Sequence, residues 1–317
     1  MFIDKTSIKM KYTYALLALN SLFLVGLQPQ IASASTLSTV LYDSSGLPED
    51  DTPRWLAPGA IDSNGFPITD INSFQTVDST TNAFTLQTNN IDSSSDTAGY
   101  LGYSNYTAVA NTDTPNPFDV KLELVNPAFP VLNADDSYSV FFEVGVNPFE
   151  VNSTDRGSFS IVAISSDISK GIELDFDENT IFAQSDVDNG SGFSQFTRAE
   201  EFNSGSTIDL SQLNSYELKI NSSTYQLFAN GDTSAILTGN LRDYEFSTVL
   251  TNPPLPFNPY ETENFLFFGD LTDRAAGSFT LGEVRVETAT ASTPEFDFTL
   301  ALSLIGVGMI GKRIFKK

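Results

Sequence analysis

The order of hydrophobic and polar residues between about residue 36 and residue 287 is typical of short β-strands joined by polar turns. Residues 139–146 and 158–164 are rich in β-branched and aromatic side chains, which favour strands. Residues 118–124 alternate between apolar and polar, so this strand is predicted to bury one face and expose the other. The region shows no convincing helical periodicity and no internal repeat.

The clearest local element is a hairpin. Residues 216–220 alternate, Asn221-Ser222-Ser223 supplies a turn, and residues 225–229 return before a second turn at Asn230-Gly231. Such turns between alternating segments are a strong hairpin signal. Many strands at this spacing predict an all-β fold, a two-sheet jelly-roll sandwich. We expect one such domain over residues 35–288.

The first 34 residues have the pattern of a secretory signal peptide that forms a helix. Three lysines precede an apolar run, and Ala32-Ser33-Ala34 follows with small residues at the spacing that a signal peptidase requires. This order predicts export, with cleavage after Ala34. A membrane anchor or a buried helix is the alternative interpretation.

The last residues form a second apolar segment with a basic end. Residues 289–297 are predicted to be a linker, residues 298–311 a short transmembrane helix, and residues 312–317 a basic tail. As a helix, the apolar run is about 21 Å long, which is short for a hydrocarbon core of about 30 Å. Lys312 and Arg313 would reach the far headgroups by extending their side chains.

The tail resembles the PEP-CTERM sorting signal of bacterial surface proteins. Thr293-Pro294-Glu295, the apolar run and the basic cluster at Lys312 and Arg313 carry this resemblance, although Phe296 stands where that family usually has proline. The resemblance implies sorting by an exosortase-type processing enzyme, transient anchoring in the inner membrane, and a final location at the cell surface, in the outer envelope or in the extracellular matrix.

Composition removes several classes of function. The 317 residues carry a formal net charge of −24, which repels nucleic acid. The chain has no cysteine and no histidine, so disulfides, thiol chemistry and histidine-based triads are excluded. Catalysis would depend on carboxylates, and a metal would be held by oxygen ligands, with calcium as the expected ion. No cofactor is otherwise expected.

Four segments in the second half of the domain are similar to a concanavalin A-like or laminin G-like jelly roll. They are YELKINSSTYQLFANG, ILTGNLRDY, NFLFFGD and SFTLGEVRVE. More narrowly, the chain resembles the secreted cyanobacterial proteins grouped as choice-of-anchor domains. The segment LYDSSGLPEDDTPRWL is also similar to that group. This resemblance implies a fold and a location but no catalytic residue.

These observations lead to the expectation of a non-enzymatic surface or matrix protein that binds extracellular polysaccharide. The first alternative is a carboxylate-dependent glycoside hydrolase, and the second is a purely structural component of the envelope.

The sequence GIELDFDE approaches the E-x-D-x-x-E pattern of jelly-roll glucanases. Glu173 and Asp175 would share one side of a strand, whereas Glu178 would join them only through a β-bulge. The competing interpretation is a strand with solvated acids that runs into a turn.

Two further segments have candidate roles. Asp186, Asp188 and Asn189 lie in an acidic, glycine-bearing stretch that is a hypothetical calcium site, with ordinary turn chemistry as the alternative. The proline-rich stretch 251–260 is too stiff for a strand. Its Phe257 and Tyr260 would either stack on a sugar ring or pack down over a sheet edge.

Overall fold

The computed structural model describes residues 36–61, 67–68, 71, 74–79, 83–87, 100–110, 120–151, 153–188, 194–205, 207–246, 257–272 and 275–289. The predicted signal peptide with Ala32 and Ala34, the linker with Pro294 and Glu295, the apolar helix at 298–311 and the tail with Lys312 and Arg313 lie outside these residues. Among the described residues, no helix is long and apolar enough to cross a membrane.

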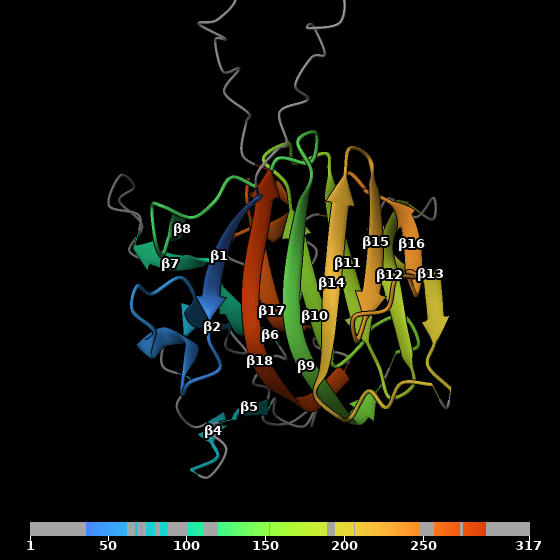
Figure 1. Cartoon of the computed structure of the whole chain (residues 1–317), viewed down its shortest axis with the longest axis horizontal. Helices are drawn as coiled ribbons and strands as arrows, with labels where there is room; N and C mark the ends of the chain where they lie inside the picture. Colours follow the sequence, from blue (N-terminus) through green and yellow to red (C-terminus); the bar gives the residue numbers. More distant parts are fainter. Residues whose placement is uncertain are drawn as a thin grey trace, which may run out of the picture. The chain divides into compact units, whose positions relative to one another are not determined.

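Two large antiparallel sheets form the domain and confirm the predicted jelly-roll sandwich (Figure 1). Sheet A contains, in spatial order, β16 (Leu237–Asn240), β15 (Thr224–Ala229), β14 (Asn214–Asn221), β9 (Tyr138–Val151), β18 (Ala275–Ala289), β5 (Phe84–Gln87) and β4 (Gln75–Val77), and β1 (Thr36–Tyr42) also pairs with β18. Sheet B contains β13 (Ser194–Asn203), β12 (Thr180–Asp188), β11 (Gly171–Phe176), β10 (Phe159–Ile164), β17 (Leu266–Leu271), β6 (Tyr100–Ser104), β2 (Ala57–Ile61) and β3 (Pro67–Ile68).

Smaller elements complete the described part of the chain. The strands β7 (Tyr106–Ala110) and β8 (Val120–Leu124) form a separate two-stranded sheet. Two short 3-10 helices, η1 (Pro48–Asp50) and η3 (Pro259–Glu261), lie in the connections. The alternation predicted over 118–124 is present in β8, where Lys121 and Glu123 are exposed and the apolar residues are half-buried.

The predicted hairpin is confirmed as β14 and β15. Asn221 pairs with Thr224, so Ser222 and Ser223 form a two-residue turn, and Ser222 has a positive φ of 56°. At the next turn, Asn230 and Gly231 have φ values of 53° and 75°. Asparagine and glycine tolerate this left-handed conformation best, which explains why they occupy this turn.

The core lies between the facing sides of the two sheets. Phe142 of β9 packs against Tyr216 of β14 with ring centroids 5.3 Å apart, and it meets Phe268 and Phe176 of sheet B at 5.9 and 6.2 Å. Phe159 and Phe279 join the two sheets in the same way at 4.9 Å. Because each buried Phe stabilises the fold by about 1.5–3 kcal/mol, this layer fixes the sheets face to face and leaves their outer faces available for function.

Candidate functional site

Two carboxylates lie side by side on the outer face of sheet B. Ile172, Leu174 and Phe176 of β11 belong to the core, so the alternate residues Glu173 and Asp175 point the other way. Both carboxylates nevertheless have zero solvent exposure, because other side chains cover this face. The predicted placement of these two acids on one side of a strand is confirmed.

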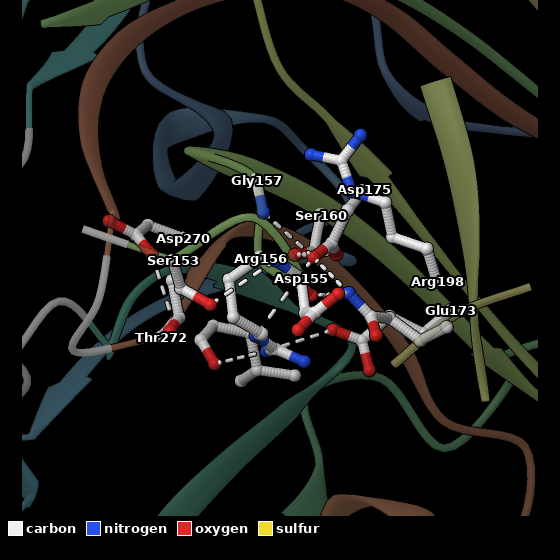
Figure 2. Close-up of polar contacts among 12 residues, drawn as sticks. Ser153, Asp155, Arg156, Gly157, Ser160, Glu173, Asp175, Arg198, Asp270 and Thr272 are labelled. Atoms are coloured by element: carbon white, nitrogen blue, oxygen red, sulfur yellow. Dashed lines mark hydrogen bonds and ion pairs between the residues drawn. The ribbon is translucent and has the colours of Figure 1, made fainter. Parts of the chain in front are cut away.

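Arg156 lies between the two acids and comes from the segment that precedes β10. Its Nη2 is 3.1 Å from Oε1 of Glu173, and its Nε is 3.9 Å from Oδ2 of Asp175. Nη2 also donates to the carbonyl oxygen of Leu271 at 2.8 Å. Figure 2 shows these groups converging. The arrangement places one guanidinium against two buried carboxyl groups. A buried charge without a partner would be strongly destabilising, because it loses its hydration.

Asp175 is held by three hydrogen bonds. The Ser160 hydroxyl donates to Oδ1 at 2.6 Å, and the Gly157 N–H donates to Oδ2 at 2.9 Å (Figure 2). The Gln184 Nε2 also donates to Oδ2, at 2.6 Å. Glycine is required at 157, because a Cβ there would lie 2.5 Å from the carbonyl oxygen of Phe176. The carboxylate of Asp175 is therefore fixed by its neighbours and serves to orient Gln184.

Aromatic side chains cover the two acids. The Tyr260 hydroxyl, from η3, donates to Oε2 of Glu173 at 2.5 Å. The Tyr244 hydroxyl donates to the Gln184 carbonyl oxygen at 3.1 Å and accepts the Glu173 N–H at 2.9 Å. The rings of Tyr244, Phe196 and Phe246 lie 4.8, 5.6 and 5.3 Å from that of Tyr260. We call Arg156, Ser160, Glu173, Asp175, Gln184, Tyr244 and Tyr260 the sheet B cluster.

The environment of Glu173 changes its acidity. Burial is the main cause that raises the pKa of Glu173 to about 8. The charge of Arg156 and the hydrogen bond from Tyr260 lower this pKa, whereas the nearby Asp175 raises it further. Burial likewise raises the pKa of Tyr260 well above its ordinary value. Glu173 therefore holds a proton near neutral pH, and a carboxylic acid in this state can transfer that proton.

Replacing Tyr260 with phenylalanine is expected to lower the free energy of unfolding by about 1–3 kcal/mol, because a buried oxygen of Glu173 loses its donor. Chemical denaturation of the two proteins measures the difference. Tyr106→Phe is the matched control, since the Tyr106 hydroxyl donates to the Glu263 carbonyl oxygen at the exposed surface. Equal losses in both variants would contradict a special role for the Tyr260 hydroxyl.

The structure does not bring Glu178 to the other two acids. The strand β11 ends at Phe176, and the Asp177 N–H donates to the Thr180 carbonyl oxygen in the connection to β12, so Glu178 does not lie on the strand that carries Glu173 and Asp175. Glu178 is exposed in the turn after β11, where its N–H donates to Oδ1 of Asp177. The pair Glu173 and Glu178 is therefore not assembled as an active site here.

The hypothetical calcium residues are only partly described. Asp186 is half-buried in β12, Asp188 ends that strand, and Asn189 lies outside the described residues. In the described ranges, no group of three or more acidic side chains is arranged to hold a metal ion. A calcium site at these residues remains a prediction.

Sequence reasoning missed Arg156, Gln184 and Tyr244 as members of the cluster. The scarcity of basic residues in the domain was the one signal that pointed to Arg156, because a rare cation among many acids tends to be paired. The sequence predicts that Tyr260 either stacks on a sugar or packs over a sheet edge, and in the structure Tyr260 packs over the face of sheet B at Glu173.

No family model and no curated protein matches the chain. Solved structures match in fold. One is the alginate lyase AlyC3 in complex with dimannuronate, with a TM-score of 0.45 and 8% sequence identity; the match covers 78% of this chain and 97% of the lyase chain. A family 7 alginate lyase A1-II′ in complex with a substrate has a TM-score of 0.40 and 12% identity over 78% and 98%. A carbohydrate esterase from a Shiga toxin-encoding bacteriophage has a TM-score of 0.42 and 10% identity over 81% and 100%.

These findings correct the functional expectation from the sequence. The solved structures named above are alginate lyases and a carbohydrate esterase. Their likeness to the chain is one of fold, and it runs against the expectation of a non-enzymatic protein, whether binding or structural. The glycosidase alternative, which needs Glu178 beside Glu173, is not supported by the geometry, because Glu178 is exposed in the connection after β11.

Proposed function

We propose that the chain is an enzyme that processes a polysaccharide, with the sheet B cluster as its catalytic centre. The observation that supports this most directly is Glu173, whose pKa is raised to about 8 by burial beside Arg156 and Asp175. A carboxyl group with a pKa near the working pH is suited to general acid–base catalysis.

The surroundings of Glu173 assign roles to its neighbours. Arg156 and the Tyr260 hydroxyl contact the two oxygens of Glu173 and fix the direction in which its proton is transferred. Asp175 orients Gln184 and shares the guanidinium, so it is a positioning residue. Glu173 is the residue that we assign to proton transfer with the substrate.

The substrate class is argued from the aromatic side chains. Phe196, Tyr244, Phe246 and Tyr260 form a continuous group of rings above the carboxylates, and binding sites for small organic groups are lined by such rings with a few placed polar groups. The solved structures above are described as alginate lyases and a carbohydrate esterase. Because Glu173 is fully buried, the proposed reaction requires Tyr260 to move away when a sugar chain binds.

The test is an activity assay with the full chain on a panel of uronate-containing, acetylated and neutral polysaccharides. Unsaturated uronate ends, new reducing ends and released acetate are scored in parallel, and they separate elimination, hydrolysis and deacylation. We expect one of these products, and we expect Glu173→Gln to lower its rate of formation by about 100-fold. Glu178→Gln, an exposed neighbour, is expected to retain the rate. Absence of all three products, or a rate equal in both variants, would refute the proposal.

We also propose that this enzyme is exported and sorted as a choice-of-anchor type protein with a PEP-CTERM-like tail. The support is the order of basic, apolar and small residues before Ala34 and the Pro294-Glu295 motif before the apolar run. Signal peptidase and an exosortase-type enzyme would be its processing partners. Mass measurement of the mature protein from an exosortase-containing host checks this, since cleavage after Ala34 and loss of the tail give defined masses.

A further inference from the structure

A row of alternating charged and aromatic side chains crosses the outer face of sheet A. The strand register aligns Arg285 of β18 with Phe141 of β9, Phe141 with Glu217 of β14, and Glu217 with Phe228 of β15. These strands lie next to one another in the sheet (Figure 1). The residues between them in sequence, such as Phe142 and Tyr216, belong to the core, so the row faces outward.

A cavity of about 340 Å³ lies over this row. Besides the four residues of the row, its lining includes Glu143, Asp232 and Glu283. Glu143 pairs with Ser215 across β9 and β14, two residues along the strands from Phe141 and Glu217. We call this cavity, with its seven named side chains, the sheet A groove.

The backbone of β18 makes room for Glu143. The register between β18 and β9 shifts between Leu281 and Val284, and Gly282 lies in this bulge. A Cβ on Gly282 would lie 2.5 Å from Oε2 of Glu143. The bulge and the glycine therefore let the Glu143 side chain lie flat against the sheet inside the groove, a typical use of a bulge to direct a side chain.

The negative charge of the groove is only partly compensated. Glu283 pairs with Arg285 at 2.8 Å, and Glu217 pairs with Lys219 at 3.2 Å. Within the described ranges, Glu143 and Asp232 have no cation at ion-pair distance, and Glu143 accepts only the Glu283 N–H, at 3.4 Å. The groove therefore has two carboxylates that attract a positive group from solution.

The two aromatic rings of the groove already face cations. The Arg285 guanidinium lies 3.8 Å from the centroid of Phe141, and the Lys219 ammonium lies 5.3 Å from that of Phe228. Both distances are within the range of cation–π attraction. The rings are therefore already paired with cations of the protein itself, so the attraction for a further positive group comes from Glu143 and Asp232, while the rings offer apolar surface to the body of a ligand.

We propose that the sheet A groove binds a positively charged sugar, namely the glucosamine units of a cationic polysaccharide. An ammonium group pairs with Glu143 or Asp232, hydroxyl groups donate to the remaining carboxylate oxygens, and the sugar body lies on Phe228. A metal ion is the poorer occupant, because no three acidic side chains of the described residues gather as metal ligands. The groove and the sheet B cluster lie on opposite faces of the sandwich, so this proposal does not depend on the proposed catalytic function.

The test is calorimetric titration of the full chain with a glucosamine hexamer and with the N-acetylglucosamine hexamer, at a mildly acidic pH where the free amines are protonated. We expect the charged hexamer to bind at least about tenfold more tightly, which corresponds to about 1.4 kcal/mol. Glu143→Gln is expected to raise the Kd of the charged hexamer about tenfold. Gly282→Ala keeps the charge and displaces the Glu143 side chain, so it is expected to weaken binding several-fold.

Glu123→Gln is the matched control, because it removes the same charge from an exposed residue of β8 that pairs with Lys121. It is expected to leave the Kd unchanged. Equal affinity for the charged and the acetylated hexamer would overturn the proposal. So would equal weakening by Glu143→Gln and Glu123→Gln, since the acidic chain would then attract the oligomer without a defined site. Thermal melts verify that each variant is folded.

Discussion

Replacing Arg156 with methionine is expected to lower the free energy of unfolding by about 3–5 kcal/mol at neutral pH, the usual cost of removing one partner from a buried ion pair. The Arg156 side chain is 8% exposed and both of its carboxylate partners are fully buried. Without the guanidinium, Asp175 loses its only cation among the described residues of the cluster, and the protonated Glu173 loses the polar contact at its Oε1. For a domain of this size the melting temperature would fall by roughly 10 °C.

A double-mutant cycle separates the ion pair from simple loss of packing. The cycle also needs the single variant Asp175→Asn and the double variant with Arg156→Met. We expect the free energy of unfolding of the double variant to fall by less than the sum of the two single decreases. Lys121→Met is the control, because Lys121 and Glu123 form an exposed pair, and its loss is expected to stay below about 1 kcal/mol. Additive losses across the cycle would show that Arg156 and Asp175 do not stabilise one another.

The sheets were the most predictable part of this structure. The alternation of apolar and polar residues along a strand can be read from neighbouring residues alone. Because successive side chains of a strand point to opposite faces, this alternation assigns each side chain to one face of the sheet. The hairpin of β14 and β15 follows from this rule together with the turn residues at Ser222-Ser223 and Asn230-Gly231. The same rule places Glu173 and Asp175 on one face of β11 from the sequence alone.

The covering of that face was not predictable from local patterns. Alternating acids on a strand indicate a solvated face, yet Glu173 and Asp175 are fully buried. Tyr260 reaches Glu173 from 87 positions further along the chain, and Arg156 reaches it from the segment before β10. Local periodicity contains no information about which distant segment packs over a sheet, so burial and the raised pKa of Glu173 emerge only in the folded state.

The raised pKa of Glu173 makes stability depend on pH in a defined direction. Its pKa is about 8 in the folded protein, against an ordinary value of 4.5, so the folded state binds this proton more tightly than the unfolded state. The stability that the protonated group contributes is fully present below pH 4.5 and is lost as the pH rises through 8. The loss amounts to about 1.4 kcal/mol per pH unit within the window, on the order of 3–5 kcal/mol in total.

Glu173→Gln is expected to remove this dependence, so its effect on the free energy of unfolding grows from near zero to stabilising across the window. At pH 4.5 the wild-type side chain is a neutral acid, similar in shape to glutamine, so the two proteins should differ little in stability. Above pH 8 the wild-type protein must bury an additional charge, and the variant should then be the more stable by a few kcal/mol. Denaturant unfolding of both proteins across this range measures the difference, with Glu178→Gln as the exposed control. A difference that stays constant with pH would mean that Glu173 is already ionised in the folded protein, and it would remove the basis for assigning proton transfer to this residue.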